Sequence, residues 1–73
     1  MTETEFIDEL IDILELEEKN VMLKTPILLD SLSTLSIIAF LDQNFSKKAT
    51  ANELREVSTI NDILLLAGEE NIR

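Results

Sequence analysis

Residues 30–45 read DSLSTLSIIAFLDQNF, and this stretch decides how the chain folds. Asp30 is a residue type that caps helices well, so the sequence predicts a helix that begins at Ser31 and runs to Phe45. A serine in the first turn of a helix has an exposed hydroxyl. The unpaired N–H groups and partial positive charge at a helix N-terminus suit a phosphate. Asp-Ser-Leu is a short motif that chance often produces, so its meaning depends on its surroundings.

The apolar side chains of this helix fall into two sectors at about 100° per residue. One sector is the expected core face and holds Thr34, Ile37, Ile38, Leu41 and Phe45. The other holds Leu32, Leu35 and Ala39 beside Ser33, Ser36 and Gln43, with Phe40 at its edge. A helix that is apolar on nearly every side is either central in its bundle or keeps a binding face. Because full burial is hard in so small a domain, the sequence favours a binding face.

The size and composition of the chain indicate one small helical domain over residues 1–73. The 73 residues are 45% hydrophobic, almost all aliphatic. A domain this short buries only about 60% of its unfolded surface. One Gly and one Pro leave few of the turn signals that a β-protein needs. We therefore expect an all-α fold, a small four-helix bundle with a short third helix.

The remaining helices are predicted from caps and apolar periodicity. Thr2 and Glu5 can form a capping box before a helix at about residues 3–16, whose apolar stripe holds Phe6, Leu10, Ile13 and Leu14, with Ile7 and Ile11 beside it. Residues 17–29 read as a connecting loop. Its first part, residues 17–20, is polar. Pro26 stops any helix before it. The apolar residues of the loop are expected to hold it on the core: Val21, Leu23, Ile27, Leu28 and Leu29.

Two shorter helices follow the central one. A second capping box, Thr50 with Glu53, predicts a helix at about residues 51–56 with Leu54 and Val57 facing inward. Ser58 or Thr59 then caps a last helix at about residues 60–67. Its expected inward residues are Ile60, Ile63, Leu64 and Ala67. Gly68 is a natural stop, and the tail from Glu69 to Arg73 is expected to fray.

Charge and missing residue types exclude several functions. Fifteen acids against six bases give a net charge of −9, which disfavours nucleic acid and favours partners with basic patches. Without Cys or His, the chain has no disulfide framework, zinc-thiolate site or histidine general base, so we expect neither an enzyme nor a metal site. No apolar run approaches the roughly 18 residues of a membrane span, and no signal peptide is recognisable. We expect a cytoplasmic monomer.

The order of elements resembles the acyl carrier protein family: a long helix, a pinned loop, a long helix opening at Asp-Ser-Leu, a short helix and a last helix. The likeness covers almost the whole chain and is strongest over residues 30–45. Thr25-Pro26 is similar to the Thr-Pro that commonly precedes the site in carrier proteins. The resemblance implies a helical bundle of acyl-carrier type, and the length and acidity of the chain agree with it.

The resemblance also implies a cofactor and partners. Ser31, between Asp30 and Leu32, matches the serine that carries 4′-phosphopantetheine, transferred from coenzyme A by a phosphopantetheinyl transferase. The arm then holds acyl groups as thioesters and presents them to loading and transferring enzymes, as in fatty acid and lipid synthesis. The cofactor would supply the thiol that the chain lacks. Partner contacts are expected on the second sector, at Leu32, Ser33, Leu35, Ser36 and Ala39.

Several features depart from the family pattern and leave alternatives open. Only residues 27–29 separate the Thr-Pro from Asp30, fewer than carrier proteins usually have. Ser33 and Ser36 stand where fatty-acid carriers favour acids, which points to a specialised lipid or secondary-metabolite pathway. An aminoacyl or peptidyl carrier is one alternative. A helical adaptor without a prosthetic group, binding through Leu32, Leu35 and Phe40, is another. The sequence does not identify the cargo, the pathway or the loading enzyme.

Overall fold

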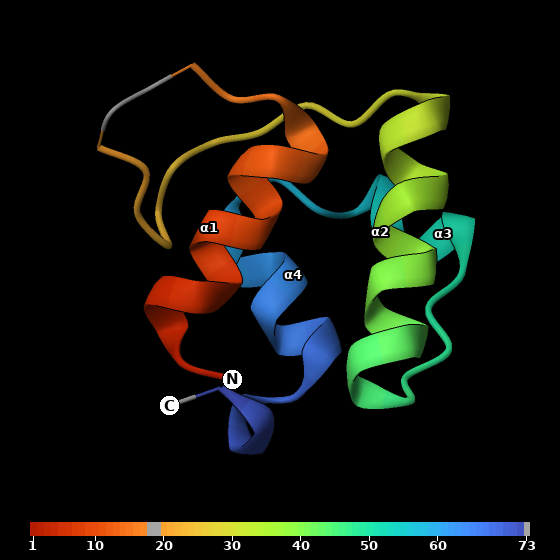
Figure 1. Ribbon diagram of the computed structural model, residues 1–73. Coiled ribbons are helices and arrows are strands. Elements are labelled where there is room, and N and C mark those ends of the chain that lie inside the picture. The colour runs from red at the N-terminus through yellow and green to blue at the C-terminus, as the bar shows by residue number, and fades with distance from the viewer. Residues whose placement is uncertain (18–19, 73) are drawn as a thin grey trace.

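Helices make up most of the chain (Figure 1). The computed structural model describes residues 1–17 and 20–72. Within them lie α1 (Glu3–Leu14), α2 (Ser31–Phe45), α3 (Ala51–Arg55), α4 (Ile60–Ala67) and a 3-10 turn, η1 (Glu69–Asn71). The expected all-helical class and short third helix are confirmed, and the bounds of α2 and α4 agree with the sequence prediction.

Helix starts follow the capping chemistry of the sequence. Thr2 and Glu5 form a reciprocal capping box on α1, and Thr50 and Glu53 form another on α3. Thr59, rather than Ser58, caps α4. Helix ends are less well predicted: α1 ends at Leu14 instead of residue 16, and α3 ends at Arg55 instead of residue 56. Glu15 adopts a left-handed conformation (φ 53°), which closes α1 early.

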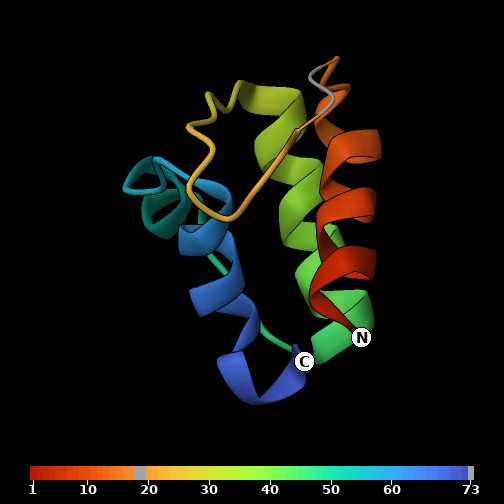
Figure 2. The same ribbon diagram turned by 90° about the vertical axis from the view of Figure 1, so that its left-hand side faces the viewer.

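The α2 helix is central in the bundle, because it packs against α1, α3 and α4 (Figures 1 and 2). Ile37 and Leu41 on its predicted core face are fully buried, and Ile38 and Phe45 are half-buried against the core. The inward residues predicted for α4 are all buried: Ile60, Ile63, Leu64 and Ala67. Phe6 and Leu10 of α1 and Leu54 of α3 belong to the same buried cluster.

Phe40 corrects the predicted division of α2. The sequence placed it at the edge of the exposed sector, but its side chain is buried. Its ring stacks at a tilt on Phe6, with centroids 5.9 Å apart, and edge-on against Phe45 at 5.7 Å. An aromatic ring at the sector boundary is large enough to turn into the core, where α1 offers a partner ring. The adaptor hypothesis therefore loses Phe40 as a contact residue.

The connecting segment before α2 is pinned as expected, through backbone hydrogen bonds to the α3–α4 connection and to the first turn of α4. The N–H of Ile27 donates to the carbonyl of Ser58 at 2.8 Å, and the N–H of Asn61 donates to the carbonyl of Leu23 at 2.8 Å. Ile27 is buried, as predicted. Leu28 was expected on the core but is 97% exposed, because extended backbone alternates its side chains and Ile27 takes the inward position. Residues 18 and 19 of the predicted polar segment lie outside the described residues.

The C-terminal tail is ordered against the bundle, so the prediction that it frays is wrong for residues 69–72. Gly68 (φ 96°) ends α4 and redirects the chain into η1. Ile72 then lies buried in the core, and the N-terminal amine of Met1 donates to the carbonyl of Asn71 at 3.4 Å. The buried isoleucine anchors the tail. The sequence did not predict this, because the preceding residues 69–71 are all polar. Arg73 lies outside the described residues.

Candidate functional site

The start of α2 has the geometry predicted for a capped helix. Asp30 is extended (φ −97°, ψ −175°), and its Oδ1 accepts a hydrogen bond from the N–H of Ser33 at 2.7 Å. The first intrahelical bond runs from the N–H of Thr34 to the carbonyl of Asp30 at 2.9 Å. The N–H groups of Ser31 and Leu32 therefore precede the intrahelical ladder and point out of the helix end. Ser31 itself is exposed.

The cap also fixes the charge beside Ser31. The backbone N–H of Ser33, followed by its hydroxyl, holds the pKa of the Asp30 carboxyl below its usual value. The carboxylate is therefore ionised at neutral pH. Its Oδ1 is already hydrogen-bonded to the N–H of Ser33.

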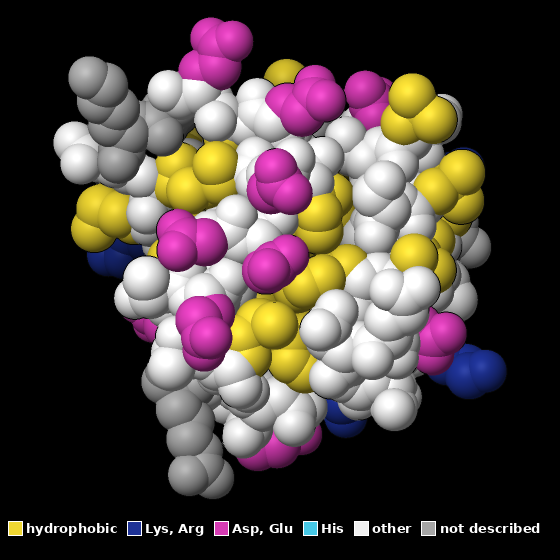
Figure 3. Space-filling view, in the orientation of Figure 1, with side chains coloured by type: hydrophobic (Ala, Val, Ile, Leu, Met, Phe, Trp, Pro, Cys, Tyr) yellow, Lys and Arg dark blue, Asp and Glu magenta, His cyan; other side chains and the backbone are white. Residues whose placement is uncertain are grey.

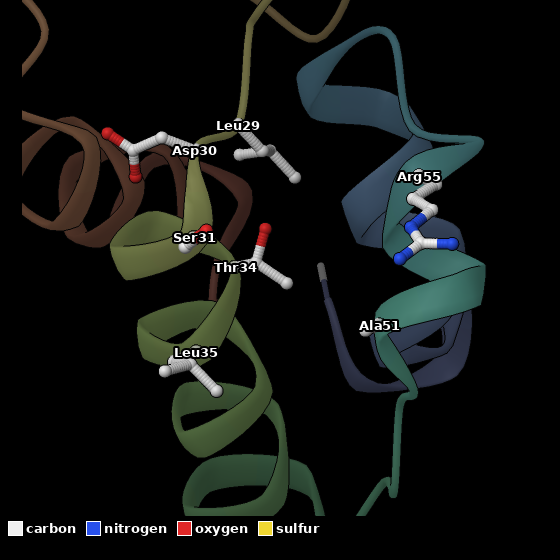
Figure 4. Close-up of a pocket in the computed structure, with 7 residues that line it drawn as sticks. All are labelled: Leu29, Asp30, Ser31, Thr34, Leu35, Ala51 and Arg55. Atoms are coloured by element: carbon white, nitrogen blue, oxygen red, sulfur yellow. The ribbon is translucent and has the colours of Figure 1, made fainter.

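An open cleft of about 530 Å³ lies beside Ser31, between the N-terminal half of α2 and α3 (Figure 4). Its walls are formed by Leu29, Asp30, Ser31, Thr34, Leu35, Ala51 and Arg55. Leu29 and Thr34 point toward α3, and the Asp30 carboxylate is directed to the other side of α2 (Figure 4). A cleft of this size is in the range of small-ligand sites.

The sequence interpretation did not anticipate this cleft. Thr34 and Leu29 were assigned to the core, and Ala51 and Arg55 were given no role. The cleft depends on tertiary packing, which the sequence does not show. Because the buried Leu54 holds α3 opposite α2, Ala51 and Arg55 face the cleft. The sequence shows the cleft only indirectly. Ala51, a small residue, stands three positions before the buried Leu54, and Arg55 follows it directly.

Exposed apolar side chains flank Ser31 on the outer surface. Leu28, Leu32 and Leu35 are 97%, 77% and 63% exposed. We call these three the leucine patch; apolar side chains lie along this end of α2 in Figure 3. Of the other residues predicted to bind partners, Ser36 and Ala39 are exposed and Ser33 is half-buried. The predicted partner residues therefore lie together on one side of α2, next to Ser31.

Charge is unevenly distributed over the molecule. Acidic side chains gather over α1 (Figure 3), and the first turn of α2 holds none. Lys47 pairs with Glu70 at 3.8 Å, far along the chain from the site. Among residues 1–17 and 20–72, no group of three or more acids is placed to hold a metal ion. In the same residues, no helix has the length and apolar character needed to cross a membrane.

Comparison with known proteins gives no match, whether to protein-family models, to curated proteins or to solved structures.

Proposed function

We propose that this protein is an acyl carrier to which 4′-phosphopantetheine is attached at Ser31. In the attachment step, Ser31 Oγ attacks the coenzyme A phosphorus that bears the pantetheine arm. A phosphodiester to Ser31 forms, and the bond to the adenosine 3′,5′-bisphosphate leaving group breaks. The hydroxyl proton passes to a base of the transferase. The arm supplies a thiol that carries acyl groups as thioesters.

The observation that carries this proposal is the position of Ser31. It combines an exposed hydroxyl, adjacent outward N–H groups and an open cleft at the N-terminus of a 15-residue helix. The N–H groups and the helix dipole favour the negative charge of a phosphodiester. Exposure lets a transferase approach the oxygen. The chain contains no cysteine, so the arm would provide its only thiol.

The outer surface suits the delivery of such an arm to other proteins. The leucine patch lies immediately beside Ser31 and carries no charge. A partner that covers this patch is brought to the attachment point. Since the first turn of α2 holds no acidic residue, docking at Ser31 is expected to depend more on apolar contact than on charge.

Intact mass tests the attachment. The protein is incubated with coenzyme A and a broad-specificity phosphopantetheinyl transferase, and wild type is expected to gain the mass of one arm. Ser31→Ala is expected to gain nothing, while Ser58→Ala, which removes another exposed serine, behaves as wild type. A wild type that stays unmodified with several transferases would refute the proposal, as would modification of Ser31→Ala.

A second function, a helical adaptor without a prosthetic group, is favoured by the exposure of the leucine patch alone. It predicts that a partner binds equally well to wild type and Ser31→Ala, and that wild type takes no arm. An aminoacyl or peptidyl carrier differs only in cargo. It is distinguished by whether the modified protein is charged by an amino-acid-activating or an acyl-activating enzyme.

A further inference from the structure

Arg55 is the basic side chain on the wall of the cleft that faces Ser31 (Figure 4). It ends α3, and one of its nitrogens, Nη1, donates to Asn52 Oδ1 at 3.3 Å. Guanidinium has five donors, so most of its hydrogen-bonding capacity is left for a ligand or water. Only six bases occur in the whole chain, which makes a base at this position notable.

Arg55 forms no ion pair in the part of the chain that the structure describes. Among residues 1–17 and 20–72, no carboxylate lies within 4.0 Å of its guanidinium. Asp30 lines the same cleft, but its carboxylate accepts the N–H of Ser33 and points to the far side of α2 (Figure 4). The rest of the wall is apolar or neutral: Leu29, Ser31, Thr34, Leu35 and Ala51. The cleft thus has one cation, Arg55, on a largely uncharged wall, and its one carboxylate, that of Asp30, is turned away.

We propose that this cleft seats cargo that ends in a carboxylate, with Arg55 as the residue that selects it. The inference rests on the proposed attachment at Ser31. The chemical class is a dicarboxylic acid joined to the arm at one end, with the other end ionised. Leu29, Leu35 and Ala51 contact the methylene chain, and the guanidinium fork binds the carboxylate oxygens in a two-point pair.

Two anionic groups of a loaded arm could reach a guanidinium, the phosphodiester and the cargo carboxylate. The phosphodiester is bonded to Ser31 Oγ and is stabilised by the N-terminus of α2, whereas Arg55 stands on the α3 wall across the cleft. The space between these walls has the size of a small-ligand site, so we assign it to the cargo end of the arm rather than to the phosphodiester.

The tether makes a weak site effective. An exposed arginine–carboxylate pair is worth little in water, equivalent to at most about a five-fold preference. A flexible tether raises the local concentration of the cargo to about the millimolar range. A single exposed pair then changes the fraction of time that the cargo occupies the cleft. The expected discrimination between charged and neutral cargo is about two- to five-fold.

The test compares three arms attached to Ser31 with the transferase: one without cargo, one with glutaryl and one with glutaramyl, each cargo joined through an amide to prevent hydrolysis. Glutaramyl replaces the carboxylate by a neutral carboxamide of the same shape. The readout is the ¹⁵N–¹H signal of Arg55 Nε, together with the backbone signals of Thr34 and Ala51. Glutaryl is expected to shift all three relative to the cargo-free arm, and glutaramyl to shift the Arg55 signal little.

Matched variants separate charge from folding. Arg55→Gln is expected to abolish the difference between glutaryl and glutaramyl at Thr34 and Ala51 without changing the melting temperature, because Arg55 is exposed. Lys48→Gln removes the same charge outside the cleft and is expected to keep the difference. Equal signal shifts with glutaryl and glutaramyl would overturn the proposal. It would also be overturned if the cargo-free arm alone produced the full shift of the Arg55 signal, because Arg55 would then bind the phosphodiester. Intact mass is checked first: a chain that takes no arm refutes both proposals, whereas a loaded chain without selectivity refutes this one alone.

Discussion

Leu41→Ala and Leu35→Ala make the same chemical change on α2 at two positions with opposite environments. Leu41 is fully buried in the core, while Leu35 is 63% exposed beside Ser31. Truncating a buried leucine costs about 2–5 kcal/mol through lost burial and the cavity left behind. A domain of this length has roughly 4–11 kcal/mol of stability, at about 0.05–0.15 kcal/mol per residue. Leu41→Ala therefore removes a large share of it.

Urea unfolding followed by far-UV circular dichroism measures both variants. Leu41→Ala is expected to lose at least about 2 kcal/mol, which lowers Tm by at least about 8 °C in a domain this small. Leu35→Ala is expected to stay within about 0.5 kcal/mol of wild type. Similar losses at both positions would show that the assignment of the two α2 faces is wrong.

The same pair is expected to reverse its order in a partner assay. Leu35 belongs to the leucine patch, so Leu35→Ala should slow arm transfer by about five-fold or more, the effect of losing about 1 kcal/mol of contact. Transfer is measured as the initial rate of mass gain with the transferase, at low and physiological salt. Weak salt dependence is expected, because docking rests on apolar contact. A rate that collapses at physiological salt while Leu35→Ala equals wild type would show that the acidic surface governs docking.

Three further outcomes are expected. Asp30→Ala should lower the free energy of unfolding by about 1 kcal/mol through loss of the α2 cap, whereas Asp30→Asn keeps most of it; equal loss in both, by urea unfolding, would contradict a capping role. Cap N–H groups lower the pKa of Glu5, Asp30 and Asp62, so their stabilisation is present above an unfolded pKa of about 4 and is lost as pH falls through the lower folded values. Tm should therefore decline below about pH 4. The decline should be smaller in a triple variant that carries Glu5→Gln, Asp30→Asn and Asp62→Asn. Phe40→Ala should destabilise by about 3–5 kcal/mol and more than Phe45→Ala, because Phe40 is buried and Phe45 half-buried; the reverse order in thermal melts would contradict the observed packing.

Helix starts were predictable because their chemistry is local. Thr2, Asp30 and Thr50 each satisfy N–H groups three residues ahead, an interaction that needs no tertiary partner. Helix ends depend on more distant packing and were less accurate. The buried Ile72 shows the same limit, since its anchoring contacts come from the core rather than from residues 69–71.

In the candidate site, too, the local feature was predictable and the tertiary feature was not. Ser31 at the first position of α2 was expected from Asp30 and the apolar periodicity that follows, and the structure places it there. The cleft across from it was not expected, because Arg55 and Thr34 are 21 positions apart and meet only when α3 packs on α2. No periodicity in a five-residue helix reveals which way its last side chain faces.

The sequence by itself determined the helical class, the capped start of α2 at Ser31 and the inward residues of α4, because hydrogen bonding within one turn and a 3.6-residue period act along the chain. Tertiary structure turned Phe40 inward and left Leu28 in water, and both outcomes depart from the sequence prediction. It also placed Arg55 opposite Ser31. These outcomes depend on how few neighbours a small bundle can offer its central helix: α1, α3 and α4 cover one side of α2, and the remaining apolar side chains stay on the surface beside the serine.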